Sequence, residues 1–373
     1  MANNGFKAID SDLHVLEPAD LWERYIDPKF KDRAPRGLTD VRRGLGVVVE
    51  GQVIGHADKG IGRKRRDYAS NLQHQHYAEV EARNYDGIGL LGAMDREGLD
   101  LAVLYPSRGL LVVSVPGLDR MLFNAISRAY NDWRHDLCQA DPARLFGAAM
   151  VPATDVGAAV AEARRVREQY QFKAIFLTAD VYEGCGWDHP CYYPLWEECQ
   201  RQELVVGFHT TGTPSLRPGQ AGGMFSTWMQ LHTFTHAVPA MEALAAFTAG
   251  GVLEAFPNLK VAFLEANCSW VPWLLWRLDE HYELGGFIER PQLKMKPSEY
   301  FLRQCYVSIE CDEYPAKGIE AFGIEDNLVF STDFPHPDSK WPFAVDSVLK
   351  LPLSDALKRK FLWDNSRKLY SLS

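Results

Sequence analysis

The sequence lacks the features that direct a chain to a membrane or to nucleic acid. It has no apolar run of about 18 residues, and no charged segment followed by an apolar one opens it, so we expect neither a membrane-spanning helix nor a secretory leader. Its 49 acidic residues outnumber its 40 basic residues, which gives a formal net charge of −9. Nucleic acids and anionic membranes require a basic surface. We therefore expect a cytoplasmic protein whose partner is a small molecule, with no nucleic-acid or membrane partner.

Cysteine is scarce and irregularly spaced. The seven cysteines form an odd set without paired, regular spacing, which is typical of a reducing compartment. Cys185, Cys191 and Cys199 are too loosely spaced for a zinc knuckle, and we interpret them as structural. The only basic run, residues 63–66, is either a solvated loop or a local anchor for an anionic part of a substrate.

The apolar residues that are present form short runs separated by helix-length segments. The chain has 373 residues, of which 46% are hydrophobic, and one α/β barrel with insertions fits that length as well as two domains would. We take residues 1–373 as a single domain. The candidate strands are Ala8–His14, Leu101–Tyr105, Phe146–Val151, Ala174–Thr178, Leu204–His209, Val261–Glu265, Tyr306–Ile309 and Leu328–Asp333.

Segments between these strands have helical periodicity. Apolar residues recur at three and four positions over 122–140, 156–170 and 241–256. Eight alternating units predict a (β/α)8 TIM barrel. The alternative is an open, doubly wound sheet, but that fold would need a glycine-rich phosphate turn after its first strand, where this chain has Asp12 and His14.

Carboxylates and imidazoles stand where three of the strands end. Asp12 and His14 are two residues apart, so they share one face of a strand. His209 ends another strand, and Asp333 ends the last one, with His336 just beyond. Because the ends of parallel strands meet at one rim of a barrel, this spacing predicts a single metal site.

Two long segments do not belong to a minimal barrel. Residues 35–84, after the first strand, are charged and punctuated by glycine, and residues 212–228, after the fifth, are rich in Gly, Pro, Ser and Thr. Loops after the strands build the active-site face of a barrel. We interpret 35–84 as an inserted loop region and 212–228 as an active-site loop, each of them a lid, a substrate wall or a tolerated surface insertion.

Taken together, these motifs resemble the amidohydrolase superfamily. The similarity rests on Asp-x-Asp-x-His-x-x-Glu-Pro at 10–18, on His209, on 250–260 and on Ser-Thr-Asp-Phe-Pro-His-Pro at 331–337, and it runs to 370. The most similar branch is the amidohydrolase-related group, which also contains the aminocarboxymuconate-semialdehyde and resorcylate decarboxylases. The resemblance implies a (β/α)8 barrel with a divalent metal bound by residues of strands one, five and eight.

Carried over to this chain, the resemblance implies that Asp12, His14, His209 and Asp333 are metal ligands. The first position is often histidine elsewhere in the family. Asp12 replaces that nitrogen with oxygen, which makes the set of metal ligands harder in the hard–soft sense. Two carboxylates and two imidazoles suit Zn, Mn or Fe, and the added oxygen favours manganese and iron.

The sixth strand departs further from the related decarboxylases. They have a histidine that serves as acid and base, whereas this chain has Glu265. A glutamate can transfer protons or become a ligand beside a cation. His236, which shares a helix face with His232, and His336 are further ligand candidates. This surplus of donors predicts one ion or two, with Glu265 or Asp12 as a bridge, and it favours the ligand role for Glu265. Glu310 is a candidate for supporting the ligands.

Three activities are compatible with such a site. The leading hypothesis is a metal-dependent hydrolase, in which metal-bound water attacks a carbonyl, Asp333 accepts its proton and Glu265 or His236 protonates the leaving group. The first alternative is a non-oxidative decarboxylase of an aromatic acid, against which the missing strand-six histidine counts. The second is a non-heme diiron monooxygenase, as in a branch similar to this family in bacterial terpenoid biosynthesis.

The substrate is less clearly encoded than the metal site. Trp228 and Trp270, near the ends of strands five and six, favour an apolar or aromatic ligand, although Trp273 and Trp276 at helical spacing are expected to pack their helix. Arg108 is a candidate partner for a substrate carboxylate or else a structural ion-pair member. The stretch 270–281 resembles the subunit contact of the family, which implies a homodimer.

Overall fold

The barrel predicted from the apolar runs is present. The computed structural model describes residues 5–40, 45–55, 76–179, 185–210, 227–313, 319–336 and 339–372. Eight strands form one sheet in the order β1-β5-β6-β7-β8-β9-β10-β11, and each neighbouring pair is parallel. The strands are β1 (Ile9–His14), β5 (Leu101–Tyr105), β6 (Leu145–Met150), β7 (Ala174–Thr178), β8 (Val205–His209), β9 (Val261–Phe263), β10 (Cys305–Ile309) and β11 (Leu328–Phe330).

The first and last strands lie side by side and close the barrel. The His14 amide donates to the Phe334 carbonyl over 2.8 Å, and the Thr332 amide donates to the Asp10 carboxylate over 3.2 Å. This seam brings the end of β1 next to the segment that follows β11. It thereby places Asp12 and His14 beside Asp333, although more than 300 residues separate them in the sequence.

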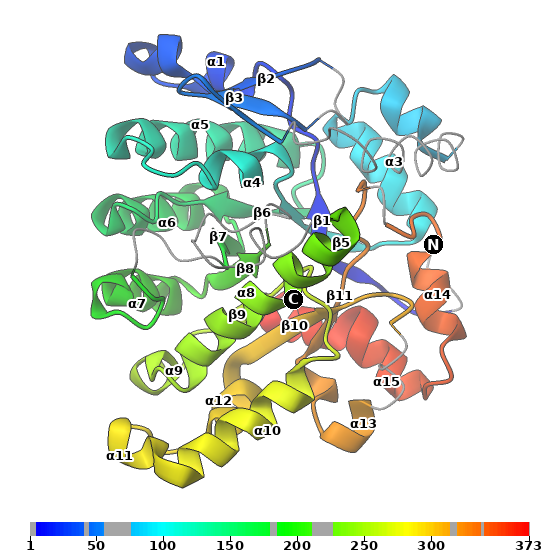
Figure 1. The fold of residues 1–373 in the computed structure, drawn as a ribbon. Coiled ribbons are helices and arrows are strands. Elements are labelled where there is room, and N and C mark those ends of the chain that lie inside the picture. Colours follow the sequence, from blue (N-terminus) through cyan, green and yellow to red (C-terminus); the bar gives the residue numbers. More distant parts are fainter. Residues whose placement is uncertain are drawn as a thin grey trace.

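Helices connect the strands and cover the outside of the sheet, and Figure 1 shows α5, α6 and α7 packed one beside another. Asp119 and Asp155 cap α5 and α6, because each carboxylate accepts an amide hydrogen bond from the first helical turn. The helices are α1 (Leu21–Tyr25), α3 (Gly87–Glu97), α4 (Arg108–Val113), α5 (Arg120–Cys138), α6 (Val156–Tyr170), α7 (Tyr193–Gln202), α8 (Trp228–Thr248), α9 (Val252–Ala255), α10 (Val271–His281), α11 (Phe287–Glu289), α12 (Pro297–Gln304), α13 (Ile319–Phe322), α14 (Ala344–Lys350), α15 (Asp355–Arg359) and α16 (Asn365–Leu369).

Two of the three helices expected from periodicity are confirmed, and the third is corrected. The predicted helix 156–170 coincides with α6, and 122–140 overlaps α5. The predicted helix 241–256 is wrong as one unit, because α8 begins at Trp228, ends at Thr248 and is followed by the short α9. Gly251 lies between them at φ +94°, in the left-handed region that interrupts a helix.

The beginning of the 35–84 segment is a small sheet and not an irregular loop. β2 (Arg36–Gly37), β3 (Val47–Val49) and β4 (Gln52–Ile54) pair antiparallel, and β3 contacts α4. Residues 76–82 are helical. The basic run 63–66 and nearly all of the 212–228 segment lie outside the described residues, so their predicted roles stay predictions.

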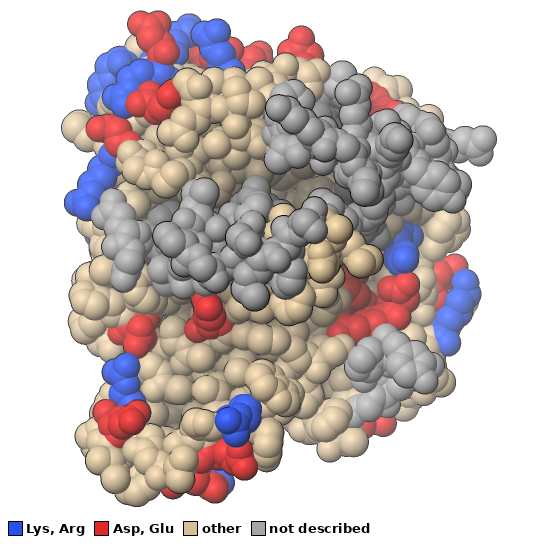
Figure 2. Space-filling model, in the orientation of Figure 1, with Lys and Arg blue, Asp and Glu red and all other residues tan. Residues whose placement is uncertain are grey.

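Charges of both signs are mixed on the face of the molecule that Figure 2 shows, where the blue and red side chains of the described residues lie mostly around its margin. This face has no broad basic area in its described part, which agrees with the net charge of −9. Within the described ranges, no helix is both long enough and apolar enough to span a membrane.

Candidate metal centre

Asp12, His14 and His209 meet at the ends of their strands. Their donor atoms all lie within 4.8 Å of one another, and all three side chains are fully buried. The Nε2 atoms of His14 and His209 are 3.0 Å apart, and the Asp12 carboxylate lies 3.6 Å from the first and 3.5 Å from the second. The structure therefore brings together the pair from β1 and the histidine of β8, as predicted.

The hydrogen bonds of the two histidines leave both Nε2 atoms available to a cation. Nδ1 of His14 lies 2.6 Å from the Pro106 carbonyl, and Nδ1 of His209 lies 2.5 Å from the Thr210 carbonyl. Because a carbonyl can only accept, each Nδ1 carries a hydrogen and each neutral ring has its lone pair on Nε2. A carbonyl contact of this kind orients many metal-binding histidines.

Asp12 provides a separate indication that the pocket fits a cation. Both of its carboxylate oxygens are buried, and neither has a hydrogen-bond donor among the described residues. Burying an anion without compensation is expensive. A divalent ion held by Asp12, His14 and His209 would satisfy these oxygens and both Nε2 lone pairs, so the donor set fits the metal that the sequence predicts.

Asp333 and His336 complete one side of this cluster. Nδ1 of His336 lies 2.7 Å from Oδ1 of Asp333, and that oxygen lies 3.6 Å from Nε2 of His14. Nε2 of His336 is 3.0 Å from the Ser107 hydroxyl. His336 therefore orients Asp333. It also belongs to a second group with His14, Glu265 and Asp333, whose donor atoms all lie within 4.8 Å of one another, so its predicted ligand role stays a prediction.

Glu265 and His236 also belong to this pocket. One carboxylate oxygen of Glu265 is 3.0 Å from Nε2 of His209, and the other is 3.3 Å from Nε2 of His236. His236 belongs to α8, and its Nδ1 donates to the His232 carbonyl over 3.0 Å. The two oxygens of one carboxylate thus face two histidines from different elements.

Glu265 and Asp333 both have a strained backbone. Their φ angles are +50° and +55°, in the left-handed region where non-glycine residues are uncommon. Such a conformation costs on the order of 1 to 3 kcal/mol and concentrates at functional sites. The Glu265 amide donates to the Ser308 hydroxyl over 2.9 Å, which helps to hold this turn.

Charges in the pocket are strongly coupled. Burial raises the pKa of Asp12 and lowers the pKa of His14, because each loses the hydration of its charged form. Burial also lowers the pKa of His209 and of His236, but nearby carboxylates outweigh it and raise both above the ordinary value. Burial raises the pKa of Glu265, yet His209 and His236 bring it well below its usual range. A cation that bound here would displace protons from the histidines that ligate it.

Some supporting residues were not singled out from the sequence. The buried Asp10 carboxylate accepts amide hydrogen bonds from Asp12 and Thr332, and burial raises its pKa to about 7. The Glu313 carboxylate accepts amide hydrogen bonds from Cys268 (3.1 Å) and Ser269 (2.9 Å), in the turn that follows Glu265. The Asp-x-Asp spacing indicated Asp10, but nothing in the sequence pointed to Glu313.

The predicted substrate residues have other contacts. Arg108 is fully buried, and its guanidinium donates to the carbonyls of Glu17 (3.0 Å) and Thr39 (2.8 Å). The Trp270 indole donates to the Ala266 carbonyl over 2.7 Å. Nothing can be said of the Trp228 side chain, which lies outside the described residues. Substrate binding by these three residues stays a prediction, and the placement of Arg108 favours the structural alternative. Glu310 is partly buried, and its amide contacts Glu313.

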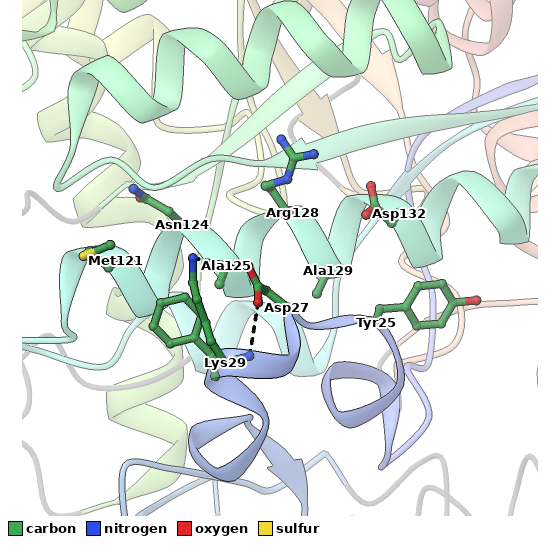
Figure 3. A pocket seen from close by; sticks show the side chains of 10 residues that line it. Tyr25, Asp27, Lys29, Met121, Asn124, Ala125, Arg128, Ala129 and Asp132 are labelled. Atoms are coloured by element: carbon green, nitrogen blue, oxygen red, sulfur yellow. Dashed lines mark hydrogen bonds and ion pairs between the residues drawn. The ribbon is translucent and has the colours of Figure 1, made fainter.

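A hollow of about 510 Å³ lies elsewhere on the molecule (Figure 3). It is lined by Tyr25, Asp27 and Lys29 on one side and by Arg128 and Asp132 of α5 on the other. It contains none of the predicted ligands, and charged groups of both signs line it. We therefore do not assign the substrate to it.

Comparison with known proteins agrees with this geometry. The chain is 24% identical over 299 residues to the gamma-resorcylate decarboxylase of Polaromonas sp. (strain JS666 / ATCC BAA-500), a match that covers 75% of this chain and 86% of the relative.

Two solved structures share the fold. One is an amidohydrolase of Mycobacterium avium subsp. paratuberculosis K-10, with a TM-score of 0.76, 19% identity and coverage of 99% of both chains. The other is the 5-carboxyvanillate decarboxylase of Novosphingobium aromaticivorans DSM 12444 with bound manganese, with a TM-score of 0.71, 18% identity and coverage of 99% of this chain and 98% of that one. The profile of the family described as Amidohydrolase matches residues 9–372, and the chain therefore belongs to the amidohydrolase family.

Proposed function

We propose that this protein is a divalent-metal-dependent, non-oxidative decarboxylase of a small aromatic carboxylic acid. The observation that carries the proposal is the position of His236, whose Nε2 lies 3.3 Å from Glu265 beside the predicted ligands. The sequence has no histidine at the strand-six position, which counted against a decarboxylase. In this proposal His236 of α8, which contacts Glu265, takes the role of that histidine. The decarboxylase names of the relatives support the same choice.

The reaction needs a proton donor and a way to hold the substrate carboxylate. The bond between the ring carbon and the carboxylate breaks, its electron pair stays on the ring carbon, that carbon takes a proton, and CO2 leaves. A bound divalent ion supplies Lewis acidity that orients the carboxylate and a neighbouring oxygen. His236 donates the proton, and Glu265 holds the imidazole in the orientation for donation.

Asp12, His14, His209 and Asp333 would hold the ion, and His336 orients Asp333. Two carboxylates and two imidazoles suit Mn2+, Fe2+ or Zn2+. We propose Mn2+, because the carboxylates make the site hard and a protein of the same fold binds manganese.

One other function has a specific observation in its favour. The two Glu265 oxygens face His209 and His236 separately. This arrangement would also suit two ions bridged by Glu265, as in a diiron monooxygenase. The hydrolase expected from the sequence would use the same ion with Asp333 as base, and no contact in the pocket favours it over decarboxylation.

The test is an assay of manganese-loaded protein with a panel of hydroxylated aromatic acids under nitrogen. We expect CO2 and the ring product in equal amounts, and we expect His236→Gln to lower kcat by roughly 10² to 10⁴. His135→Gln is the control, because His135 stacks on Tyr170 away from the pocket. Oxygen-dependent turnover with two irons, or hydrolysis of esters or amides without CO2 release, would overturn the proposal.

We propose further that the protein acts in the cytoplasm as a homodimer. All seven cysteines are free thiols, which fits a reducing compartment. An exposed apolar surface on α10 and α11, described below, supports the dimer.

A further inference from the structure

A second cluster of metal-ligand side chains lies in the connection from β7 to α7. The donor atoms of Cys185, His189 and Cys191 all lie within 4.8 Å of one another. We propose that these three residues form a second cation site, distinct from the active centre, that takes Zn2+. The alternative is the structural role that the sequence predicts for Cys185 and Cys191.

The spacing of the donors is close to what zinc requires. Zn–S bonds are about 2.3 Å and Zn–N bonds about 2.0 to 2.1 Å, so two donors of one tetrahedral ion lie roughly 3.3 to 3.8 Å apart. Donors within 4.8 Å of one another reach that spacing by small side-chain rotations. Three protein ligands leave one position for water.

The surroundings hold this segment in place. The buried Trp187 indole donates to the Ala179 carbonyl over 3.2 Å, and the Asp188 carboxylate pairs with Arg290 over 3.1 Å. His189 caps the 3-10 helix Pro190–Tyr192, because its Nδ1 accepts the Cys191 amide hydrogen over 3.2 Å. Nδ1 therefore carries the lone pair in the neutral ring. A cation bound at Nδ1 would take the place of the Cys191 amide hydrogen at this lone pair.

Sulfur makes this cluster chemically different from the active centre. The predicted ligands of the active centre offer only nitrogen and oxygen, whereas two thiolates select Zn2+ over Mn2+. The other five cysteines are buried. Cys185 and Cys191 are thus the pair that a solvent cation can reach. A bound ion would link Cys185, in the β7–α7 connection, to the 3-10 helix Pro190–Tyr192 that precedes α7.

Cobalt is the probe for this site, because thiolate-to-cobalt charge transfer gives a near-ultraviolet band that nitrogen and oxygen ligands do not. The metal-free, reduced full chain is titrated with Co2+ and then with Zn2+. We expect the band to saturate at one equivalent of Co2+ per chain and to disappear when Zn2+ is added. It should be absent in Cys185→Ser and Cys191→Ser and retained in His209→Ala.

His189→Asn is the matched variant, because asparagine also caps helices but removes the imidazole. It should lower the Zn2+ affinity at least tenfold and leave the melting temperature of the metal-free protein unchanged. A second measurement is the reaction of the native thiols with a disulfide reagent, in which Zn2+ should protect two thiols per chain. No cobalt band in the reduced wild type, an equal band in both serine variants, or thiols that react equally with and without Zn2+ would each overturn the proposal.

Discussion

At the scale of single residues, the pocket is defined by buried acceptor atoms that need a positive charge beside them. The two Asp12 oxygens are buried without donors in the described part of the chain, and the Nε2 atoms of His14 and His209 face each other over 3.0 Å. Burial lowers the pKa of His209, but nearby carboxylates outweigh it and raise the pKa above its ordinary value. A proton on its Nε2 therefore supplies positive charge here in the metal-free protein, and a bound cation would take the place of that proton. The folded pocket therefore needs a positive charge, a proton or a metal ion, beside these buried acceptor atoms.

Removing one ligand should remove the metal without unfolding the chain. We expect His209→Ala and Asp333→Ala to retain a folded barrel and to lose most of their bound metal, because a single catalytic ion needs about three protein ligands. Elemental analysis after gel filtration measures the content, and circular dichroism checks the fold. His135→Ala is the control. Wild-type metal content in both variants would show that the ligand assignment is wrong.

Glu265 distinguishes one ion from two. If one ion is held by Asp12, His14, His209 and Asp333, Glu265→Gln should keep about one metal per chain and lower kcat by roughly 10² to 10⁴, because glutamine cannot hold the His236 proton as a carboxylate does. Glutamine preserves the size of the side chain, so packing changes little. The reference protein and the variant both carry Cys185→Ser, so that the proposed zinc site does not enter the count. A fall from about two metals to one would then support the bridging role that the donor surplus in the sequence favours.

At the scale of elements, a buried carboxylate joins α3 to α14. Glu97, at the end of α3, accepts the Val345 amide hydrogen over 2.7 Å in the first turn of α14. Burial raises the pKa of Glu97 from 4.5 to about 8, and the nearby Asp10 adds to the shift. The folded protein therefore binds this proton more tightly than the unfolded chain does.

The stability of the protein should consequently fall as the pH rises from about 4.5 through about 8, by at most about 1.4 kcal/mol per pH unit for one proton. Glu97→Gln stays neutral and keeps an oxygen for the Val345 amide, so its unfolding free energy should depend less on pH and exceed that of the wild type above pH 8. Urea unfolding from pH 5 to 9 measures this. Asp95→Asn, an exposed carboxylate on the same helix, is the control, and parallel pH profiles for the wild type and Glu97→Gln would contradict the prediction.

At the scale of the whole molecule, large apolar side chains are exposed along α10, α11 and the π-helix Tyr282–Gly286 between them. Figure 1 shows α10 and α11 at the lower edge of the molecule. Trp273 and Trp276 are each 56% exposed, Ile288 is 70% exposed and Leu284 is 83% exposed. The expectation that Trp273 and Trp276 pack their own helix is therefore wrong in this chain. Large apolar side chains exposed close together often mark a contact with another molecule, and because 270–281 resembles a family subunit contact, we expect a second copy of this chain there.

We expect sedimentation at micromolar concentration to show a dimer. Trp276→Asp and Ile288→Asp should each shift the protein towards monomer, because a carboxylate buried in an apolar interface without a partner is costly. Phe322→Asp is the matched control, since Phe322 is 59% exposed on α13. A monomeric wild type, or an equal shift with the control, would exclude this surface as the dimer contact.

The sequence by itself determined the barrel and identified four candidate metal ligands. Buried parallel strands appear as short, nearly continuous apolar runs, so all eight strands were recognisable, and Asp12, His14, His209 and Asp333 stand at strand ends that a closed parallel barrel must bring to one rim. The end of α8 was missed, although Gly250 and Gly251 follow Thr248, because apolar residues recur on both sides of this glycine pair.

Tertiary structure decided what each polar side chain contacts. His236 reaches Glu265 because α8 packs against β8. Arg108 is buried because the carbonyls of Glu17 and Thr39 lie against its guanidinium. Cys185 meets His189 and Cys191 because the chain turns between them. Each of these contacts depends on the direction of a side chain within a packed assembly. Hydrophobic periodicity reports only which face of an element is buried, so contacts between faces are settled when the barrel closes and its helices pack.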